Sequence, residues 1–107
     1  MINNIYGQWR IVEMQEYDEK YVDAEVPAYI NFDNDSGGEF QFGYVHGFMD
    51  CYFTQGGEMV DFSWEGNDEM DDAFGRGNAT LKDGKLYGTI FFHYGDSASF
   101  IAIRLEK

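Results

Sequence analysis

Short runs of bulky apolar residues alternate with polar positions along most of the chain, and glycine-rich turns separate them. Within residues 39–45, Phe40, Phe42 and Tyr44 fall on one face, and Glu39 and other small or polar residues fall on the other. This two-residue period is typical of a strand that buries one face. The same analysis predicts strands over residues 8–15, 28–33, 39–45, 49–54, 58–65, 76–82, 85–94 and 97–105.

Turn signals separate these runs. Asp83-Gly84 predicts a two-residue type I′ hairpin, because both central positions of that turn need a positive φ. Strands joined in series by hairpins either stack as a sandwich or close into a barrel, and closure removes both exposed edges. We therefore expect an all-β fold with one domain over residues 1–107, an antiparallel eight-stranded up-and-down meander barrel.

One connection departs from the strand pattern near the start of the chain. Residues 16–27 carry mixed charge, place Tyr17, Tyr21 and Val22 near helical spacing, and end at Pro27. Proline cannot continue a helix, so this spacing predicts a short helical or ordered loop segment that covers one barrel end.

The predicted strand 85–94 is apolar on both faces. One face carries Leu86, Ile90 and Phe92, and the other carries Tyr87, Phe91 and His93. A strand of this kind is covered on its outside as well as its inside. The outer cover is expected to be either the segment 16–27 or a second subunit.

The chain is strongly acidic, with 20 Asp and Glu against 7 Lys and Arg and a formal net charge of −13. This balance disfavours direct binding of nucleic acid or an anionic membrane, which attract clusters of basic side chains. The negative charge could serve only to keep the protein soluble, or it could attract a basic protein partner or imitate a phosphate backbone. Aromatic residues make up 19% of the chain, which argues against disorder.

Cys51 is the only cysteine, so no disulfide can form within the chain. The N-terminus also lacks a secretory signal pattern, and a cytoplasmic location with no membrane span is expected. Because Cys51 shares a face with Met49 and Phe53, we expect a buried, unreactive thiol.

Gly7 and Trp9 in the first predicted strand, with Arg104 in the last, resemble the closure device of the lipocalin and calycin group of barrels. The resemblance implies that the ring of Trp9 packs at the closed end of the barrel under the guanidinium of Arg104. Members of that group are usually longer and carry a helix after the barrel, so the resemblance does not imply a roomy cup.

A second resemblance covers most of the chain. The runs WRIVEM, VPAYINF, FQFGYVHG, DFSWEG, DEMDDAFGRG and IFFHYGD resemble a group of small uncharacterised bacterial proteins, some of them carried on mobile elements. This resemblance implies a bacterial source, and it assigns no catalytic residue.

The stretch GNDEMDDAFG is the most acidic of the chain, and its carboxylates could bind Ca²⁺ or Mg²⁺. The ligand pattern of an EF-hand is absent, however. In the alternative interpretation Asn67 or Asp68 caps a one-turn helix, Gly75 ends it, and Arg76 pairs with a carboxylate such as Glu65. We predict no metal and no cofactor.

Catalytic chemistry has few candidates. His46, Asp50, Cys51 and His93 are residue types found in nucleophile–base pairs and zinc sites, but they lack the close spacing of zinc ligands. An enzyme would need an acid–base pair drawn from Glu65, Asp68 and His93. We therefore assign no catalytic residue and favour a protein that is not an enzyme.

Binding is the preferred function. We expect a small ligand of unknown identity at the barrel mouth, although the aromatic side chains could simply fill the interior. The alternative is an acidic protein-interaction module, which binds a basic partner or forms a homodimer and possibly mimics nucleic acid. The candidate ligand-binding residues are Tyr29, Tyr44, Tyr52, Trp64, Glu65, Asp68, Arg76 and His93.

Overall fold

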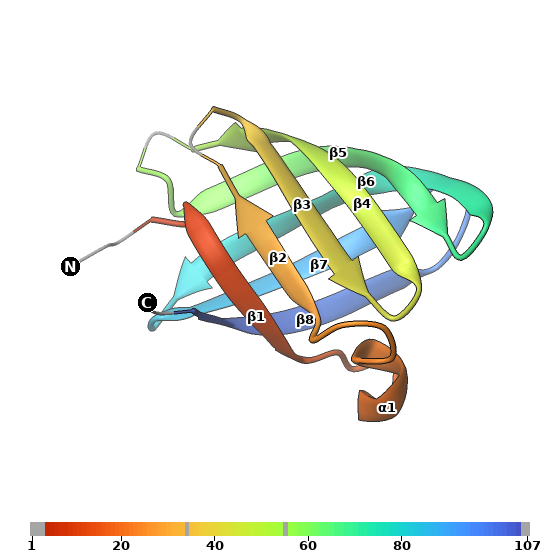
Figure 1. Cartoon of the computed structure of the whole chain (residues 1–107). Coiled ribbons are helices and arrows are strands. Elements are labelled where there is room, and N and C mark those ends of the chain that lie inside the picture. Colours follow the sequence, from red (N-terminus) through yellow and green to blue (C-terminus); the bar gives the residue numbers. More distant parts are fainter. Residues whose placement is uncertain (1–3, 34, 55, 106–107) are drawn as a thin grey trace.

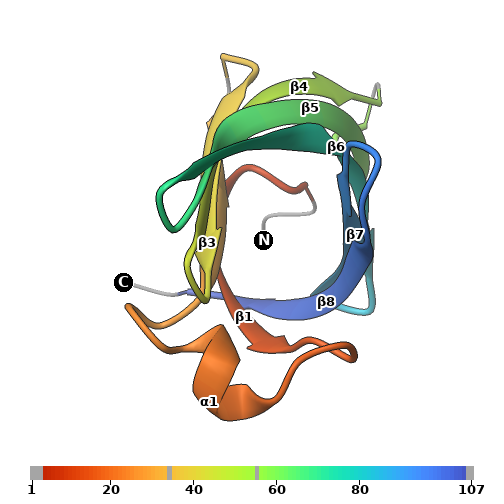
Figure 2. The same ribbon diagram turned by 90° about the vertical axis from the view of Figure 1, so that its right-hand side faces the viewer.

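The computed structural model describes residues 4–33, 35–54 and 56–105, and these residues form a closed antiparallel barrel of eight strands. Each strand pairs with the next, and β8 pairs with β1 (Figures 1 and 2). The expected all-β meander barrel is therefore confirmed. The strands are β1 (Gly7–Glu13), β2 (Tyr29–Phe32), β3 (Gly37–Phe42), β4 (Val45–Phe53), β5 (Met59–Asp68), β6 (Asp71–Lys82), β7 (Lys85–Phe92) and β8 (Ser97–Arg104).

Apolar side chains fill the inside of the barrel. Along β5, Val60, Phe62 and Trp64 are buried, while the residues between them face solvent. Trp64 packs edge-on against Phe40 and Phe92, with ring centroids 5.1 and 5.3 Å apart. Such aromatic contacts give the core a specific packing in addition to its burial.

The first correction concerns the chain between β3 and β4. Tyr44 was expected on the inner face beside Phe42, but β3 ends at Phe42 and β4 already begins at Val45. Gly43 has a φ of +56° and forms a two-residue turn with Tyr44, which is partly exposed. Glycine adopts this conformation without a steric penalty, so the turn begins at residue 43, whereas the predicted strand continued to residue 45.

The second correction concerns the acidic stretch. The expected one-turn helix does not form, because β5 and β6 continue in register until Asp68 lies opposite Asp71. Neither Asn67 nor Asp68 caps a helix, and Gly75 lies inside β6. Arg76 lies opposite Ser63, not Glu65, and pairs with no carboxylate in the part of the chain that the structure describes.

The remaining turn signals have mixed outcomes. At the β6–β7 turn Asp83 and Gly84 have φ values of +54° and +80°, which confirms the predicted hairpin. The next strand, β7, ends at Phe92, so the predicted strand 85–94 is two residues too long. The signals at 34–38 and 55–57 each include a residue outside the described ranges.

The segment before β2 contains one short helix, α1 (Glu19–Val22), and it lies against one end of the barrel, as expected (Figure 2). The Asp18 carboxylate accepts a hydrogen bond from the Tyr21 amide and caps the helix. Tyr21 lies over Gly43 in the β3–β4 turn, where a Cβ atom would clash with its ring, and the Gly43 amide donates to the Val22 carbonyl at 2.8 Å. This segment therefore packs against the β3–β4 turn, beside one end of the barrel (Figure 2).

The outer face of β7 is not covered by that segment. Tyr87 and Phe91 remain 39% and 43% exposed. Of the two covers predicted for this strand, the segment 16–27 is therefore wrong, and a second subunit stays a prediction.

Asp23, at the end of α1, fixes the segment to β1. Its carboxylate receives two hydrogen bonds from the Arg10 guanidinium, at 2.8 and 3.1 Å, and a third from the Ala28 amide at 2.9 Å. These hydrogen bonds, led by those from Arg10, hold the pKa of Asp23 below its usual range.

Replacing Asp23 by asparagine is expected to destabilise the protein by about 1 kcal/mol at neutral pH, since the pair is partly exposed. A carboxyl whose pKa is lowered on folding contributes stability that is present above its unfolded pKa of about 4 and is lost as pH falls through the folded value. Urea unfolding of Asp23→Asn should therefore show a smaller loss of stability on acidification. Asp61→Asn, an exposed carboxylate on β5, is the control, and identical acid profiles for Asp23→Asn and wild type would contradict the assignment.

Candidate functional site

The closure of the barrel joins the two ends of the chain. Trp9 lies directly opposite Arg104 in the β1–β8 ladder, and the guanidinium carbon lies 4.3 Å from the centre of the indole ring. Arg104 also donates to the carbonyls of Asn4 and Tyr6, the latter at 2.7 Å. The structure thus brings together the residues of the expected closure device, and the contact is a cation–π interaction.

Gly7 completes this closure. Its φ is +121°, and a Cβ atom there would stand 2.9 Å from an Arg104 guanidinium nitrogen. The Trp9 indole is fully buried and donates to the Ile5 carbonyl at 2.8 Å. Burial lowers the pKa of Arg104, and the group is held in place by the ring and the carbonyls. Closure occupies these side chains, so they are not available to a ligand.

The eight candidate ligand-binding residues do not converge on one site. Trp64 points into the core and donates to the Phe91 carbonyl at 3.2 Å. Tyr52 is exposed on the outside of β4, and Tyr44 lies in the β3–β4 turn. Asp68 is the last residue of β5. Only part of the predicted set is therefore brought together, and it lies on the outer wall.

That part of the outer wall carries a row of residues that the sequence analysis did not assemble. Phe48 of β4 lies opposite Glu65 of β5, which lies opposite Phe74 of β6. The three strands run side by side on the wall of the barrel (Figure 1). His93 continues the row, because its amide donates to the Phe74 carbonyl at 2.9 Å. We call Phe48, Glu65, Phe74, Phe91 and His93 the outer aromatic face.

Two grooves cross the outer aromatic face and share Gly75. The larger has a volume of about 410 Å³ and is lined by Phe48, Asp50, Ser63, Glu65 and Phe74, among others. The second, of about 300 Å³, is lined by Gly75, Arg76, Phe91, Phe92 and His93. Four predicted site residues therefore line the two grooves: Glu65, Arg76, His93 and the buried Trp64.

Histidines support both phenylalanines of the larger groove. The His46 ring packs against Phe48 at 4.8 Å between centroids, and His93 stacks on Phe74 at 4.7 Å. His46 is itself fixed, because its Nε2 atom lies 2.5 Å from the Glu39 carboxylate. The two rings are thus positioned by neighbours on the same wall.

Tyr29 does not line the larger groove, but it contacts Glu39, the residue that fixes His46. Its hydroxyl donates to the Glu39 carboxylate at 2.8 Å. Burial, together with the negative charge of Glu39, raises the pKa of Tyr29 to about 12. The hydrogen bond from His46 is the main cause that lowers the pKa of Glu39. The cluster therefore contains an ionised carboxylate between a phenol and an imidazole.

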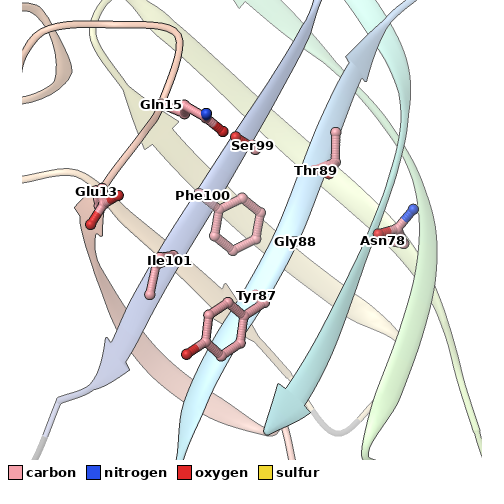
Figure 3. Close-up of a pocket in the computed structure, with 9 residues that line it drawn as sticks. All are labelled: Glu13, Gln15, Asn78, Tyr87, Gly88, Thr89, Ser99, Phe100 and Ile101. Atoms are coloured by element: carbon pink, nitrogen blue, oxygen red, sulfur yellow. The ribbon is translucent and has the colours of Figure 1, made fainter.

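A further groove, of about 350 Å³, lies over β7 and β8, beside the end of β1 (Figure 3). Its lining includes Tyr87, Thr89 and Ser99, and its only charged member is Glu13. Next to it, the Glu16 carboxylate accepts hydrogen bonds from the Ser99 amide and hydroxyl, at 2.8 and 3.1 Å. The other described residues that line this groove are uncharged, and they include both polar side chains, such as Asn78, and apolar ones, such as Ile101.

The candidates for chemistry are scattered. Glu65 and His93 line different grooves, and Asp68 lines neither. Cys51 is buried as expected, and burial raises the pKa of its thiol to about 12. Within residues 4–33, 35–54 and 56–105, no group of three or more His, Cys, Asp or Glu side chains could hold a metal ion.

Sequence reasoning missed Phe48 and Phe74. It treated Trp64 and Glu65 as one aromatic and acidic cluster, although neighbouring residues of a strand point to opposite faces. It also placed Phe74 in a helix. The alternation of β5, continued to Asp68, is the signal that could have placed Glu65 outside.

The described residues contain no helix that is both long and apolar enough to cross a membrane. No protein-family model, no curated protein and no solved structure matches this chain.

Proposed function

We propose that this protein is an interaction module without enzymatic activity, and that it binds a basic protein partner across the outer aromatic face. The observation that carries the proposal is the division of the aromatic side chains. Those inside the barrel pack against one another, whereas Phe48 and Phe74 on the outer wall are 55% and 53% exposed. Large apolar side chains gathered on an open surface are typical of interaction sites.

Charge selects the kind of partner. The protein carries a formal net charge of −13, and the larger groove contains the carboxylates of Asp50 and Glu65. A basic surface would be attracted at long range and would find apolar contacts at the centre of the face. Two copies of this chain would repel each other, because each carries a formal net charge of −13, so self-association is disfavoured at low salt.

Small-ligand binding is the second candidate. It is supported by Glu65, Arg76 and His93, which line the two grooves beside exposed aromatic rings. A ligand of this kind would bind on the outer wall, since the rings inside the barrel pack against one another.

We also propose kinship with the lipocalin group, a bacterial source and a cytoplasmic setting. The contact between Trp9 and Arg104 supports the first, and the single, buried Cys51 is compatible with a reducing compartment. The likeness of the sequence runs to small bacterial proteins supports the second.

The test uses isotopically labelled protein and polylysine as the probe. We expect polylysine to shift the amide signals of the outer aromatic face, with an affinity that falls as salt rises. The double variant Phe48→Ser/Phe74→Ser, which leaves the net charge unchanged, should bind about tenfold more weakly. Tyr52→Ser removes another exposed aromatic side chain of β4 and is the matched control.

Two outcomes would overturn the proposal. Shifts spread evenly over the acidic surface, with equal affinity for both serine variants, would reduce the interaction to non-specific charge attraction. A dimer by light scattering whose stability rises with salt would assign the face to a second copy of the chain, because salt screens like-charge repulsion.

A further inference from the structure

We infer that Phe48, Glu65 and Phe74 form a clamp for one arginine side chain of the basic partner. The inference rests on the proposed function and assigns a specific residue type to the centre of the outer aromatic face. It follows from the spacing of the three residues, from the exposed carboxylate between the rings, and from the support behind each ring.

The spacing suits a flat cation. Phe48 and Phe74 lie on β4 and β6, two strands apart, and Glu65 lies between them in the same row. Two strand spacings amount to roughly 10 Å. A planar group held between two rings needs about 7 Å, with one van der Waals contact on each side. The strand spacing exceeds this value by about 3 Å, so one guanidinium above the carboxylate contacts both rings when each ring leans inward by about 1.5 Å.

The Glu65 carboxylate is exposed on the outer wall. It makes no hydrogen bond or ion pair with any group in the described part of the chain. Three other carboxylates of the barrel are engaged in this way: Asp23 with Arg10, Glu39 with His46 and Tyr29, and Glu16 with Ser99. An arginine that enters the larger groove therefore finds both oxygens of Glu65 open for a two-pronged contact.

The rings are held before the partner arrives. Phe48 packs against His46, which is fixed by Glu39, and Phe74 stacks on His93. A side chain that is already ordered loses little conformational freedom on binding, so more of its contact energy contributes to affinity. The strands below are part of a closed barrel, which fixes the spacing between the strands that carry the rings.

These features favour arginine over lysine. The guanidinium is planar, stacks on aromatic faces and offers paired donors to a carboxylate. The lysine ammonium is a compact, strongly hydrated charge that cannot stack on two rings at once. The clamp thus gives specificity within a generally basic partner.

The experiment compares three peptides of lysine and glycine that differ only at a central residue, which is arginine, lysine or citrulline. Citrulline has the shape of arginine without its charge. Titrations of the labelled protein should give the arginine peptide an affinity about fivefold to tenfold higher than that of either other peptide. The largest shifts should fall on the amides of Phe48, Glu65 and Phe74.

Two variants with the same change of net charge distinguish the clamp from general electrostatic attraction. Glu65→Gln should remove the preference for arginine, while Asp61→Asn should retain it. Asp61 lies on the same strand and face and gives the same change of charge, but its cross-strand neighbours are Tyr52 and Asn78. Both substitutions are at exposed positions, and the amide spectrum checks that the barrel remains folded.

The failures of the clamp and of the proposed function are distinguishable. If all three peptides bind the outer aromatic face equally and lose affinity in Phe48→Ser/Phe74→Ser, the clamp is wrong and the interaction module stands. An arginine preference that persists in Glu65→Gln also overturns the clamp. If no peptide binds this face, both proposals fail.

Discussion

Replacing Trp9 by alanine is expected to destabilise the protein by about 3 to 5 kcal/mol, the usual range when a buried tryptophan is truncated. The indole is fully buried at the β1–β8 junction, so the substitution leaves a cavity where the barrel closes. It also removes the surface on which Arg104 lies and the donor to the Ile5 carbonyl. A domain of this size is stable by about 5 to 15 kcal/mol, so the variant would be close to unfolding.

Urea unfolding followed by far-ultraviolet circular dichroism measures this effect. Because Trp9→Ala could be too unstable to analyse, Trp9→Phe provides a second variant. It keeps an aromatic ring under Arg104, loses the indole hydrogen bond, and should cost about 1 to 2 kcal/mol. Val12→Ala, at a half-exposed position of the same strand, is the control and should change stability by less than about 1 kcal/mol. Similar losses for Val12→Ala and Trp9→Ala would refute the role of Trp9 in closure.

Gly75→Ala is expected to cause the second large loss of stability, because the backbone of β7 passes close to Gly75. A Cβ atom at this position of β6 would stand 1.8 Å from the carbonyl oxygen of Phe91 on β7, and 2.8 Å from its carbonyl carbon. These are main-chain atoms in a paired strand, so they can move only if the β6–β7 ladder is distorted. We expect a loss of about 3 kcal/mol, at the upper end of the range for overpacked sites.

Gly37→Ala is the matched control. Gly37 lies in β3, also paired within the barrel, and a Cβ atom there would meet only side-chain oxygens at 3.5 Å. Its cost should be within about 1 kcal/mol, and thermal unfolding of the two variants gives the comparison. Equal stability of the two alanine variants would show that the β6–β7 ladder adapts to a side chain at Gly75.

Local patterns were enough to predict the barrel. Alternation of apolar residues identified the strands, and Asp83-Gly84 identified a hairpin that the structure contains. The errors lie where a turn uses unexpected residues. Tyr44 continued an alternating pattern although Gly43 before it begins a turn, and Glu69 at the β5–β6 turn adopts a φ of +57°, which is rare for a residue other than glycine. Strand pairing overrides local preference at Glu69, whereas at Gly43 the glycine itself favours the turn.

The candidate site was harder to predict, because it depends on register between distant segments. The row from Phe48 to Phe74 spans three strands and exists only when β4, β5 and β6 pair as they do. Alternation within β4 places Phe48 and Asp50 on the face opposite the buried Met49 and Cys51, but Phe48 fell outside the predicted strand 49–54. Glu65 and Arg76 were chosen for their chemistry, and the structure supplies their aromatic neighbours.

The β1–β8 junction also determines how the molecule would respond to a pull on its two ends. β1 begins at Gly7 and β8 ends at Arg104, and both of these points lie at the same end of the barrel (Figure 1). Tension between the termini would therefore break the backbone hydrogen bonds between β1 and β8 one pair at a time, starting at this end, instead of loading all of them together. The contact between Trp9 and Arg104 lies at this end of the ladder, so it would be among the first contacts to break when the barrel opens.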